Sequence, residues 1–313
     1  MTQNYVKKDK KIKSKFLKLK EKKPKMFEKR LNLSWSNWTF GLESIEDSAM
    51  RLKEAGLKYI EIHGNQYGDD LGYDPKRIKK ILNGYGLEVS GVCGMFSINN
   101  DMSSNNPFQR QKAIDYLKRQ IELTRKLDGD YLLVVPGAVG RPDPYDEAEF
   151  ERSIDTFNRI GELFKKNDIK PAIEPIRTEE VSIIHTIKEA KEYIYACDYT
   201  SSTYINGDVF HMQTEEDHIG EAIIETNGLL TNLHFADSNR STLGSGSLDL
   251  DTIIMALYLI NYNRDGCYVT FEPLGPGGNV YEAMNYKPNK RKLDMLVKRS
   301  IAYFKKREEI LRN

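Results

Sequence analysis

Eight short apolar runs, each followed by a longer amphipathic stretch, restrict the fold of this sequence more than any other feature. Runs rich in Val, Ile and Tyr are typical of buried strands, and amphipathic stretches of a dozen or more residues are typical of the helices between them. Regular alternation of the two predicts an α/β protein with a parallel sheet. We predict strands at residues 31–34, 59–63, 88–92, 131–135, 171–174, 204–208, 230–235 and 268–272.

The stretches between these runs show helical spacing of their apolar residues. Several of them end at a glycine, as at Gly56 and Gly86, which is a common signal for the end of a helix. We predict helices at residues 44–55, 107–127, 148–167, 183–196 and 250–259.

Eight parallel strands can form either an open doubly wound sheet or a closed barrel. No G-x-G-x-x-G motif follows the first strand, and polar residues recur at strand ends all along the chain. A closed barrel accounts for this pattern better, because its active site is assembled from the carboxyl ends of many strands. We therefore predict a (β/α)₈ TIM barrel as a single catalytic domain over residues 30–313, preceded by a basic N-terminal extension over residues 1–29.

Charge is distributed unevenly along the chain. Residues 1–30 contain 13 Lys and Arg against 3 Asp and Glu, although the net charge of the whole chain is only +1. We expect the extension to be solvated, flexible or helical, without a catalytic role, and removable without loss of the barrel. Ile12, Phe16 and Leu19 have helical spacing, so a helix that docks in an oligomer remains open. The net acidic remainder argues against nucleic acid as a partner.

Composition excludes several other classes of protein. No apolar run approaches the roughly 18 residues of a membrane span, so we expect no membrane partner. The extension lacks the apolar core of a secretory signal, and the three cysteines form no paired motif. These features favour a cytoplasmic protein without structural zinc.

Four consecutive strand ends carry a side chain that could bind a metal: Glu174, Asp208, His234 and Glu272. Placing three carboxylates and one imidazole at one end of a barrel core would be electrostatically costly unless a divalent cation compensated them. An oxygen-rich set with one nitrogen suits one divalent ion, Mn²⁺ or else Mg²⁺ or Co²⁺. The sequence therefore predicts a metal site formed by these four side chains.

The motifs around these residues resemble those of a known family. They are Glu-Pro-Ile-Arg-Thr-Glu-Glu at 174–180, Asp-Val-Phe-His-Met-Gln-Thr-Glu-Glu at 208–216, His-Phe-Ala-Asp-Ser-Asn-Arg at 234–240, Gly-Ser-Gly-Ser-Leu-Asp at 244–249 and Phe-Glu-Pro at 271–273. In order and strand position they are similar to the xylose-isomerase-like barrels called sugar phosphate isomerases/epimerases. Among these, the chain most resembles the D-tagatose 3-epimerase and D-allulose (psicose) 3-epimerase family, from about residue 31 to the last helix.

The resemblance implies a metal-dependent epimerase or isomerase of a ketose or related keto-sugar. It implies epimerisation at C3 through a cis-enediolate, with Glu174 and Glu272 as metal ligands and as the acid and base on opposite faces of the reacting carbon. It assigns Glu180, His211 and Arg240 to the substrate. It also implies a small sugar as partner, and we expect a homo-oligomer, dimer or tetramer.

Further pocket residues are expected at the ends of the early strands. His63 ends the second strand and Cys93 the third, and each could line the sugar pocket or simply pack. Trp35 and Trp38 follow the first strand, and we expect one of them to pack rather than to contact substrate.

Several alternatives remain open. The Phe-Ala-Asp sequence after His234 differs from the Val-Gly-Glu of most ketohexose 3-epimerases, and it is closer to relatives that act on keto-acid sugars or other carbohydrates. The same metal set could serve an aldose–ketose isomerase or an inosose-type dehydratase. A catalytically silent carbohydrate-binding barrel is the non-enzyme alternative. A nuclease is disfavoured by the five histidines in total. Glycines at 244–246 and 275–278 could bind phosphate, but no Lys or second Arg accompanies them, which favours an unphosphorylated sugar.

Overall fold

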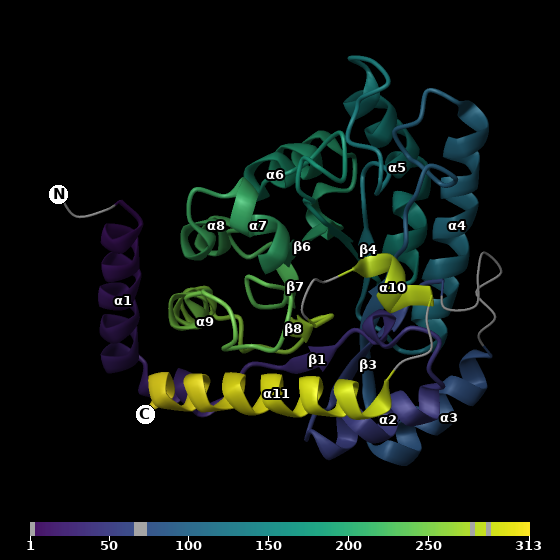
Figure 1. The fold of residues 1–313 in the computed structure, drawn as a ribbon. Helices are drawn as coiled ribbons and strands as arrows, with labels where there is room; N and C mark the ends of the chain where they lie inside the picture. Colours follow the sequence, from purple (N-terminus) through teal and green to yellow (C-terminus); the bar gives the residue numbers. More distant parts are fainter. Residues whose placement is uncertain (1–3, 66–73, 276–278, 286–288) are drawn as a thin grey trace.

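The computed structural model describes residues 4–65, 74–275, 279–285 and 289–313, and it confirms the predicted (β/α)₈ barrel (Figure 1). Eight parallel strands follow one another in the order β1-β8-β7-β6-β5-β4-β3-β2, and a bridge between Ser36 and Glu61 joins the two ends of this row. The strands are β1 (Leu33–Trp35), β2 (Tyr59–His63), β3 (Glu88–Cys93), β4 (Tyr131–Val134), β5 (Lys170–Ile173), β6 (Tyr204–Asp208), β7 (Leu230–Phe235) and β8 (Tyr268–Phe271).

Helices surround the barrel and alternate with its strands (Figure 1). They are α1 (Asn4–Lys22), α2 (Ile45–Glu54), α3 (Pro75–Tyr85), α4 (Pro107–Lys126), α5 (Glu149–Lys166), α6 (Ile187–Ala196), α7 (Val209–Glu215), α8 (Ile219–Glu225), α9 (Leu250–Leu259), α10 (Val280–Asn285) and α11 (Lys290–Arg312). Short 3₁₀ turns lie at η1 (Pro24–Glu28), η2 (Asn37–Phe40) and η3 (Thr200–Ser202). None of the helices in the described ranges is long and apolar enough to cross a membrane.

Local capping explains where the structure departs from the predicted helix bounds. The helix predicted from residue 183 begins at Ile187, because Thr186 and Glu189 form a capping box at its N-terminus. Ile184 just before it has a positive φ of 65°, which no helix allows. Between β6 and β7 the chain forms α7 and α8, each of 7 residues. Such short helices give too few turns for their periodicity to be recognised in the sequence.

Helix α1 packs beside α8 and α9 at one side of the barrel (Figure 1). Ile12 and Phe16 are buried there, and the Phe16 ring lies 5.3 Å from that of Phe27 and 6.2 Å from that of Tyr258. Most lysines of the helix are exposed. The expected solvation of the extension therefore applies to its basic face, while its apolar stripe covers α8 and α9 within the same chain.

Polar side chains fill much of the barrel interior, where branched apolar residues are usual. Asn206, Asn232 and Thr270 are fully buried on β6, β7 and β8. Because side chains two positions apart on a strand share one face, the residues that follow them by two positions point to the same interior, nearer the carboxyl ends. Those positions hold Asp208, His234 and Glu272, so the strand pleat itself directs the predicted ligands into the mouth of the barrel.

Candidate active site

A cavity of about 1390 Å³ opens at the carboxyl ends of the strands. Its wall includes all nine side chains that the sequence suggested as site residues: His63, Cys93, Glu174, Glu180, Asp208, His211, His234, Arg240 and Glu272. The fold thus brings together residues from six different strand ends.

The four predicted metal ligands lie close together, and two of the carboxylates approach the same nitrogen of His234. Nδ1 of His234 lies 3.4 Å from Oε1 of Glu174 and 3.3 Å from Oε2 of Glu272. Asp208 is paired in register with His234 on the neighbouring strand. Ligand atoms of Asp208, His234 and Glu272 all lie within 4.8 Å of one another. Strands β5 to β8 are consecutive in the sheet, and each contributes one of the four side chains to the same half of the barrel mouth.

Burial makes this cluster electrostatically unfavourable by itself. Removal from water raises the pKa of Glu174 to about 7, and burial together with the charge of Glu272 raises the pKa of Asp208 to about 8. Burial also raises the pKa of Glu272. For His234, burial opposes the charged form, but the carboxylates of Glu272 and Glu61 outweigh it and raise the pKa of the imidazole.

The donor set fits a divalent cation. Three carboxylates and one imidazole provide hard oxygen ligands and one nitrogen, a combination that suits Mn²⁺, Mg²⁺ or Co²⁺. A second grouping of Glu174, Asp208 and His211, also within 4.8 Å, extends the cluster toward the cavity. Burial, the main cause of the raised carboxyl pKa values, disfavours the ionised carboxylates, and a bound cation would stabilise them.

Arg240 lies in the loop after β7 and is buried, with 7% of its surface exposed. Its guanidinium group is 3.7 Å from Oε1 of Glu272 and 4.3 Å from the centre of the Phe210 ring. Its backbone adopts a left-handed φ of 54°, which is costly for a side chain other than glycine. The loop accepts this conformation because its carbonyl receives the N–H of Leu274, at 2.8 Å. We call Glu174, Asp208, His234 and Glu272, the four predicted metal ligands, the ligand cluster. Arg240 is held next to this cluster and does not form a surface salt bridge.

Asp237 fixes the rest of this loop. One of its carboxylate oxygens accepts the N–H of Ser238, at 2.7 Å, and the other accepts that of Gly244, also at 2.7 Å. A Cβ atom at Gly246 would lie 2.2 Å from the same carboxylate, so only glycine fits there. The glycines at 244–246 thus serve a tight turn. The segment 276–278 of the second glycine-rich loop lies outside the described residues.

Two side chains of the cavity wall each have a buried polar atom without a hydrogen-bond partner among the residues that the structure describes. Within the described part of the chain, Nε of Arg240 and Nδ1 of His211 are buried without a hydrogen-bond partner. Nε2 of His211 lies 3.2 Å from Oδ2 of Asp208, and burial lowers the pKa of this imidazole. Buried groups of this kind usually have a partner, so both residues depart from the rule that buried polar atoms are paired.

Glu180 is held by an arginine that sequence reasoning missed. Nε of Arg177 donates to Oε1 of Glu180 at 2.6 Å, and its guanidinium carbon lies 5.0 Å from the Phe210 ring that Arg240 also contacts. Arg177 is three residues after Glu174 in the predicted motif, so its position could have indicated a role at the cavity.

One of the two tryptophans after the first strand packs in the core, as predicted, and the other lines the cavity. Trp35 is buried and packs against Phe40 and Phe271. Trp38 lines the cavity and donates its indole N–H to Oε2 of Glu272 at 2.9 Å. Cavity-lining His63 accepts the N–H of Asn65 at Nδ1, at 2.9 Å, and burial lowers its pKa to about 4.

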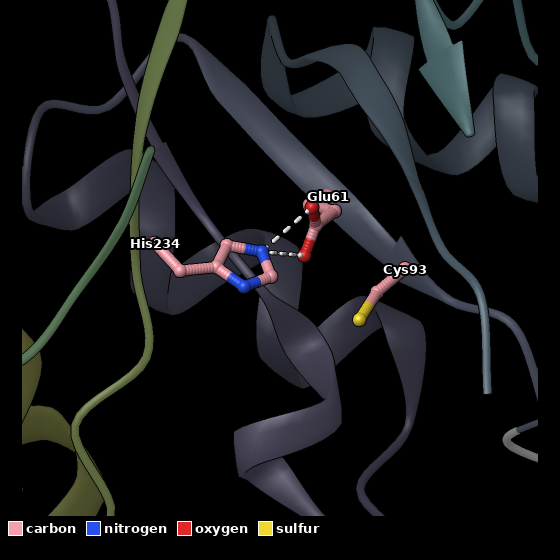
Figure 2. Close-up of side chains that lie close together, drawn as sticks. All are labelled: Glu61, Cys93 and His234. Carbon is pink, nitrogen blue, oxygen red and sulfur yellow. Dashed lines mark hydrogen bonds and ion pairs between the residues drawn. The ribbon is translucent and has the colours of Figure 1, made fainter. Parts of the chain in front are cut away.

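Glu61 is the most important residue that the sequence analysis overlooked. It is fully buried on β2, and Nε2 of His234 lies 3.0 Å and 3.1 Å from its two oxygens. Figure 2 shows the two side chains facing each other, with the Cys93 thiol nearby. Ligand atoms of Glu61, Cys93 and His234 lie within 4.8 Å of one another.

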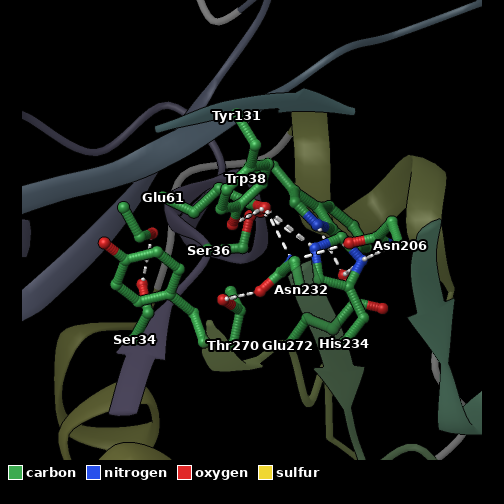
Figure 3. A network of polar contacts seen from close by, with 12 residues as sticks. Ser34, Ser36, Trp38, Glu61, Tyr131, Asn206, Asn232, His234, Thr270 and Glu272 are labelled. Carbon is green, nitrogen blue, oxygen red and sulfur yellow. Dashed lines mark hydrogen bonds and ion pairs between the residues drawn. The ribbon is translucent and has the colours of Figure 1, made fainter. Parts of the chain in front are cut away.

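Glu61 belongs to a connected set of buried polar residues beneath the ligand cluster, shown in Figure 3. We call this set the inner polar layer; it consists of Glu61, Tyr131, Asn206, Asn232 and Thr270. Gly91 leaves room for it, because a Cβ atom there would lie 2.6 Å from the Tyr131 ring. A signal existed in the sequence, since polar residues recur two positions apart within four strands, as in Glu-Ile-His, Asn-Gly-Asp, Asn-Leu-His and Thr-Phe-Glu.

Comparison with known families agrees with the resemblance seen in the sequence motifs. Residues 50–298 match the family model described as xylose isomerase-like TIM barrel. The match spans most of the barrel, including all four predicted ligands.

Curated relatives with similar sequences are sugar epimerases. A ketose 3-epimerase of Arthrobacter globiformis is 26% identical over 238 residues, which are 75% of this chain and 81% of that protein. A 3-dehydro-D-guloside 4-epimerase of Escherichia coli is 25% identical over 253 residues, 77% of this chain and 92% of that protein. Among solved structures, a D-allulose 3-epimerase from Methylomonas sp. in complex with D-allulose superimposes with a TM-score of 0.77 at 22% identity, over 89% of this chain and 98% of that one.

Proposed function

Because the chain belongs to the xylose isomerase-like TIM barrel family, we propose that it is a divalent-metal-dependent epimerase of a ketose or a related keto-sugar. The reaction that fits best is epimerisation at C3 through a cis-enediolate, with Glu174 and Glu272 as the acid/base pair. One observation carries this proposal: two buried carboxylates from β5 and β8 approach the same nitrogen of His234.

Glu174, Asp208, His234 and Glu272 would hold the cation. When bound, a divalent ion such as Mn²⁺ polarises the substrate carbonyl and stabilises negative charge on the adjacent oxygens. The four donors support this assignment because burial raises the pKa of the carboxyl groups of Glu174, Asp208 and Glu272 in the absence of a cation.

The two glutamates would move the proton. A C–H next to a carbonyl is a weak acid, so a base at one face of the carbon and an acid at the other are needed to invert its configuration. Both carboxylates are held in place, since Asn206 donates to Oε1 of Glu174 at 2.8 Å and Trp38 donates to Oε2 of Glu272.

Arg240, His211 and Glu180 would bind the substrate. Arg240 carries a permanent positive charge beside Glu272 and can stabilise the oxyanion that develops at the reacting centre. Its unpaired Nε and the unpaired Nδ1 of His211 would find their partners in substrate oxygens. His63 and Cys93 would contact the remainder of the sugar.

A second candidate is epimerisation at C4 of a 3-keto-glycoside, which needs the same chemistry one carbon further along. It is favoured by the cavity volume of about 1390 Å³, above the range of roughly 300–1000 Å³ typical of small-molecule sites. The Escherichia coli 3-dehydro-D-guloside 4-epimerase aligns over 92% of its length.

The test is deuterium uptake. Free ketoses, keto-acid sugars and 3-keto-glycosides are incubated with Mn²⁺-loaded protein in D₂O, and deuterium is located by carbon position. Uptake at C3 of a ketose with formation of its epimer is the expected result, and uptake at C4 of a keto-glycoside selects the second candidate. An aldose product would indicate an isomerase, and loss of water a dehydratase. Tight sugar binding without any carbon-bound deuterium would overturn the proposal in favour of a silent carbohydrate-binding barrel.

A further inference from the structure

The inner polar layer is fully hydrogen-bonded although it lies in the centre of a barrel. Five polar side chains there replace the branched apolar residues that usually fill such interiors. Within the described residues, none of the five has a buried side-chain atom without a partner. Burying polar groups costs free energy unless every one is paired, and even then an apolar core of equal volume is often as stable. A role beyond stability is therefore required to explain the layer.

His234 connects the inner polar layer to the ligand cluster through its two ring nitrogens. Nε2 faces both oxygens of Glu61, at 3.0 Å and 3.1 Å, while Nδ1 faces Glu174 and Glu272. A metal-binding imidazole must present a bare nitrogen to the ion and carry its proton on the other. The orientation of the ring therefore depends on which nitrogen Glu61 binds.

Glu61 is itself surrounded by donors. The hydroxyl of Tyr131 donates to its Oε1 at 2.7 Å, and the amide of Asn232 donates to the same oxygen at 3.3 Å. These donors stabilise Glu61 as an ionised carboxylate, which can only accept hydrogen bonds. Glu61 therefore accepts from His234, and the proton lies on Nε2. Nδ1, which faces the two carboxylates of the site, is then the nitrogen that can lose its proton and bind an ion.

A second arm of the layer reaches Glu174. The hydroxyl of Thr270 donates to Oδ1 of Asn232 at 2.7 Å, which fixes the orientation of that amide. The amide nitrogen of Asn232 donates in turn to Oδ1 of Asn206 at 2.7 Å. The amide nitrogen of Asn206 is thereby directed to Oε1 of Glu174. Each hydrogen bond in this series therefore fixes the orientation of the amide that donates the next one.

We propose that Glu61 is a positioning residue that, supported by Tyr131 and Asn232, fixes the tautomer and orientation of His234 so that Nδ1 can ligate the divalent ion. This inference rests on the proposed metal-dependent function. It assigns Glu61 no contact with substrate and no proton transfer at the reacting carbon. The nearby Cys93 thiol gives the alternative that Glu61, Cys93 and His234 hold a second ion of their own. The donors already bound to Glu61 argue against it, because an ion would have to displace them.

The experiment measures Mn²⁺ affinity of the metal-free protein by electron paramagnetic resonance of free Mn²⁺, independently of activity. Glu61→Gln is expected to weaken binding by roughly 10- to 100-fold, the range seen when a partner of a metal-binding histidine is removed. Tyr131→Phe, which removes only a hydroxyl, should weaken it by about 3- to 10-fold. Tyr193→Phe is the matched control for Tyr131→Phe: it removes a buried hydroxyl that bonds Ser153, away from the barrel interior, so its affinity should stay within about 2-fold.

Nitrogen-15 NMR of histidine-labelled, Mg²⁺-loaded protein reads the tautomer directly. The wild-type His234 ring should show a proton on Nε2, and Glu61→Gln should show a mixture of tautomers. If Glu61→Gln fails to fold, Tyr131→Phe carries the test. Wild-type affinity in both variants with lowered melting temperature would overturn the inference and leave a structural role. Two equivalents of Mn²⁺ per wild-type chain, reduced to one in Glu61→Gln, would overturn it in favour of the second site. A wild-type protein that binds no Mn²⁺ would refute the proposed function instead.

Discussion

The two polar layers of the barrel lie two residues apart on the same strands, yet they are built on opposite principles. At the mouth, Asp208, His234 and Glu272 form a charged cluster whose carboxyl pKa values are raised by burial. One step deeper, Asn206, Asn232 and Thr270 form a hydrogen-bonded chain without an unpaired atom among the described residues. At the mouth a ligand can enter, so buried charged groups there can obtain their partner from the bound ligand. Where none can enter, each polar group needs a partner within the protein.

The largest effect should come from removing the reactive carboxylates of the mouth. Glu174→Gln and Glu272→Gln each lose a group that can accept or return the proton, so kcat should fall by at least roughly 10²- to 10⁴-fold. The measurement is steady-state kinetics on the substrate identified by deuterium uptake, with bound metal quantified in parallel. Glu179→Gln, an exposed carboxylate at the cavity rim, is the control and should stay within about 2-fold. A variant of either glutamate that keeps its metal and its rate would be a ligand only.

Arg240→Ala should have the next largest effect, a loss of roughly 10²- to 10³-fold in kcat/KM, as when one donor to an oxyanion is removed. Metal content and thermal stability should change little. Arg177 offers a matched control, because it packs near the same Phe210 ring but is paired with Glu180. Arg177→Ala should lose less than about 10-fold. Equal losses in the two variants would mean that Arg240 acts only through general charge at the mouth.

The buried carboxyl groups at the mouth of the barrel predict that the stability of the metal-free protein depends on pH. Burial raises the pKa of Glu174 to about 7 and that of Asp208 to about 8, above their usual values of 4.5 and 3.8. The folded state therefore holds more protons than the unfolded state between these limits, and stability falls as pH rises from about 4 to 8. Mn²⁺ should restore it, and more at pH 8 than at pH 5, because the ligands must lose their protons to bind.

Thermal unfolding from pH 5 to 9, with and without Mn²⁺, checks this prediction. A metal-free melting temperature that rises steadily from pH 5 to 8 would contradict it. So would an ion that protects the protein more at pH 5 than at pH 8.

The smallest effect on catalysis is expected from helix α1, which contributes no residue to the cavity wall. We propose that residues 1–29 form an extension separate from the catalytic domain of residues 30–313. Phe16→Ala should lower the melting temperature, since loss of a buried phenylalanine costs about 3 to 5 kcal/mol at most, while kcat/KM stays within about 2-fold. Leu17→Ala, at a neighbouring position that is 52% exposed, is the control and should alter neither.

Removal of residues 1–28 should likewise leave an active barrel of lower thermal stability, because it uncovers Tyr258 and the surface of α8 and α9. Light scattering of the truncated protein distinguishes this from an oligomer contact. A change of molecular mass beyond the deleted segment would show that the extension also joins subunits.

Local sequence signals were sufficient to predict the barrel and the ligand cluster at its mouth. Strands β2, β6 and β7 have the bounds that their apolar runs predicted, and each of the four proposed ligands stands where a run ends. The carboxyl ends of all strands in such a barrel lie at the same mouth. Titratable residues at several of these ends therefore indicate the site before any contact between strands is known. The same argument offered His63 and Cys93 as possible cavity residues, and it left open which of Trp35 and Trp38 packs; the structure shows that His63, Cys93 and Trp38 line the cavity.

The polar spacing of the strands indicated members of the inner polar layer, but their pairing was decided by tertiary structure alone. Glu61 lies 173 positions from His234 in the chain, and nothing near either residue indicates that one binds the other. Their pairing follows from closure of the barrel, which brings β2 across from β7, and from the space that Gly91 leaves for Tyr131. The amide directions of Asn206 and Asn232 depend likewise on partners from other strands. Periodicity along a strand determines which side chains point inward, but only the packed barrel determines which of them meet, because hydrogen bonding depends on distances between strands that no local pattern encodes.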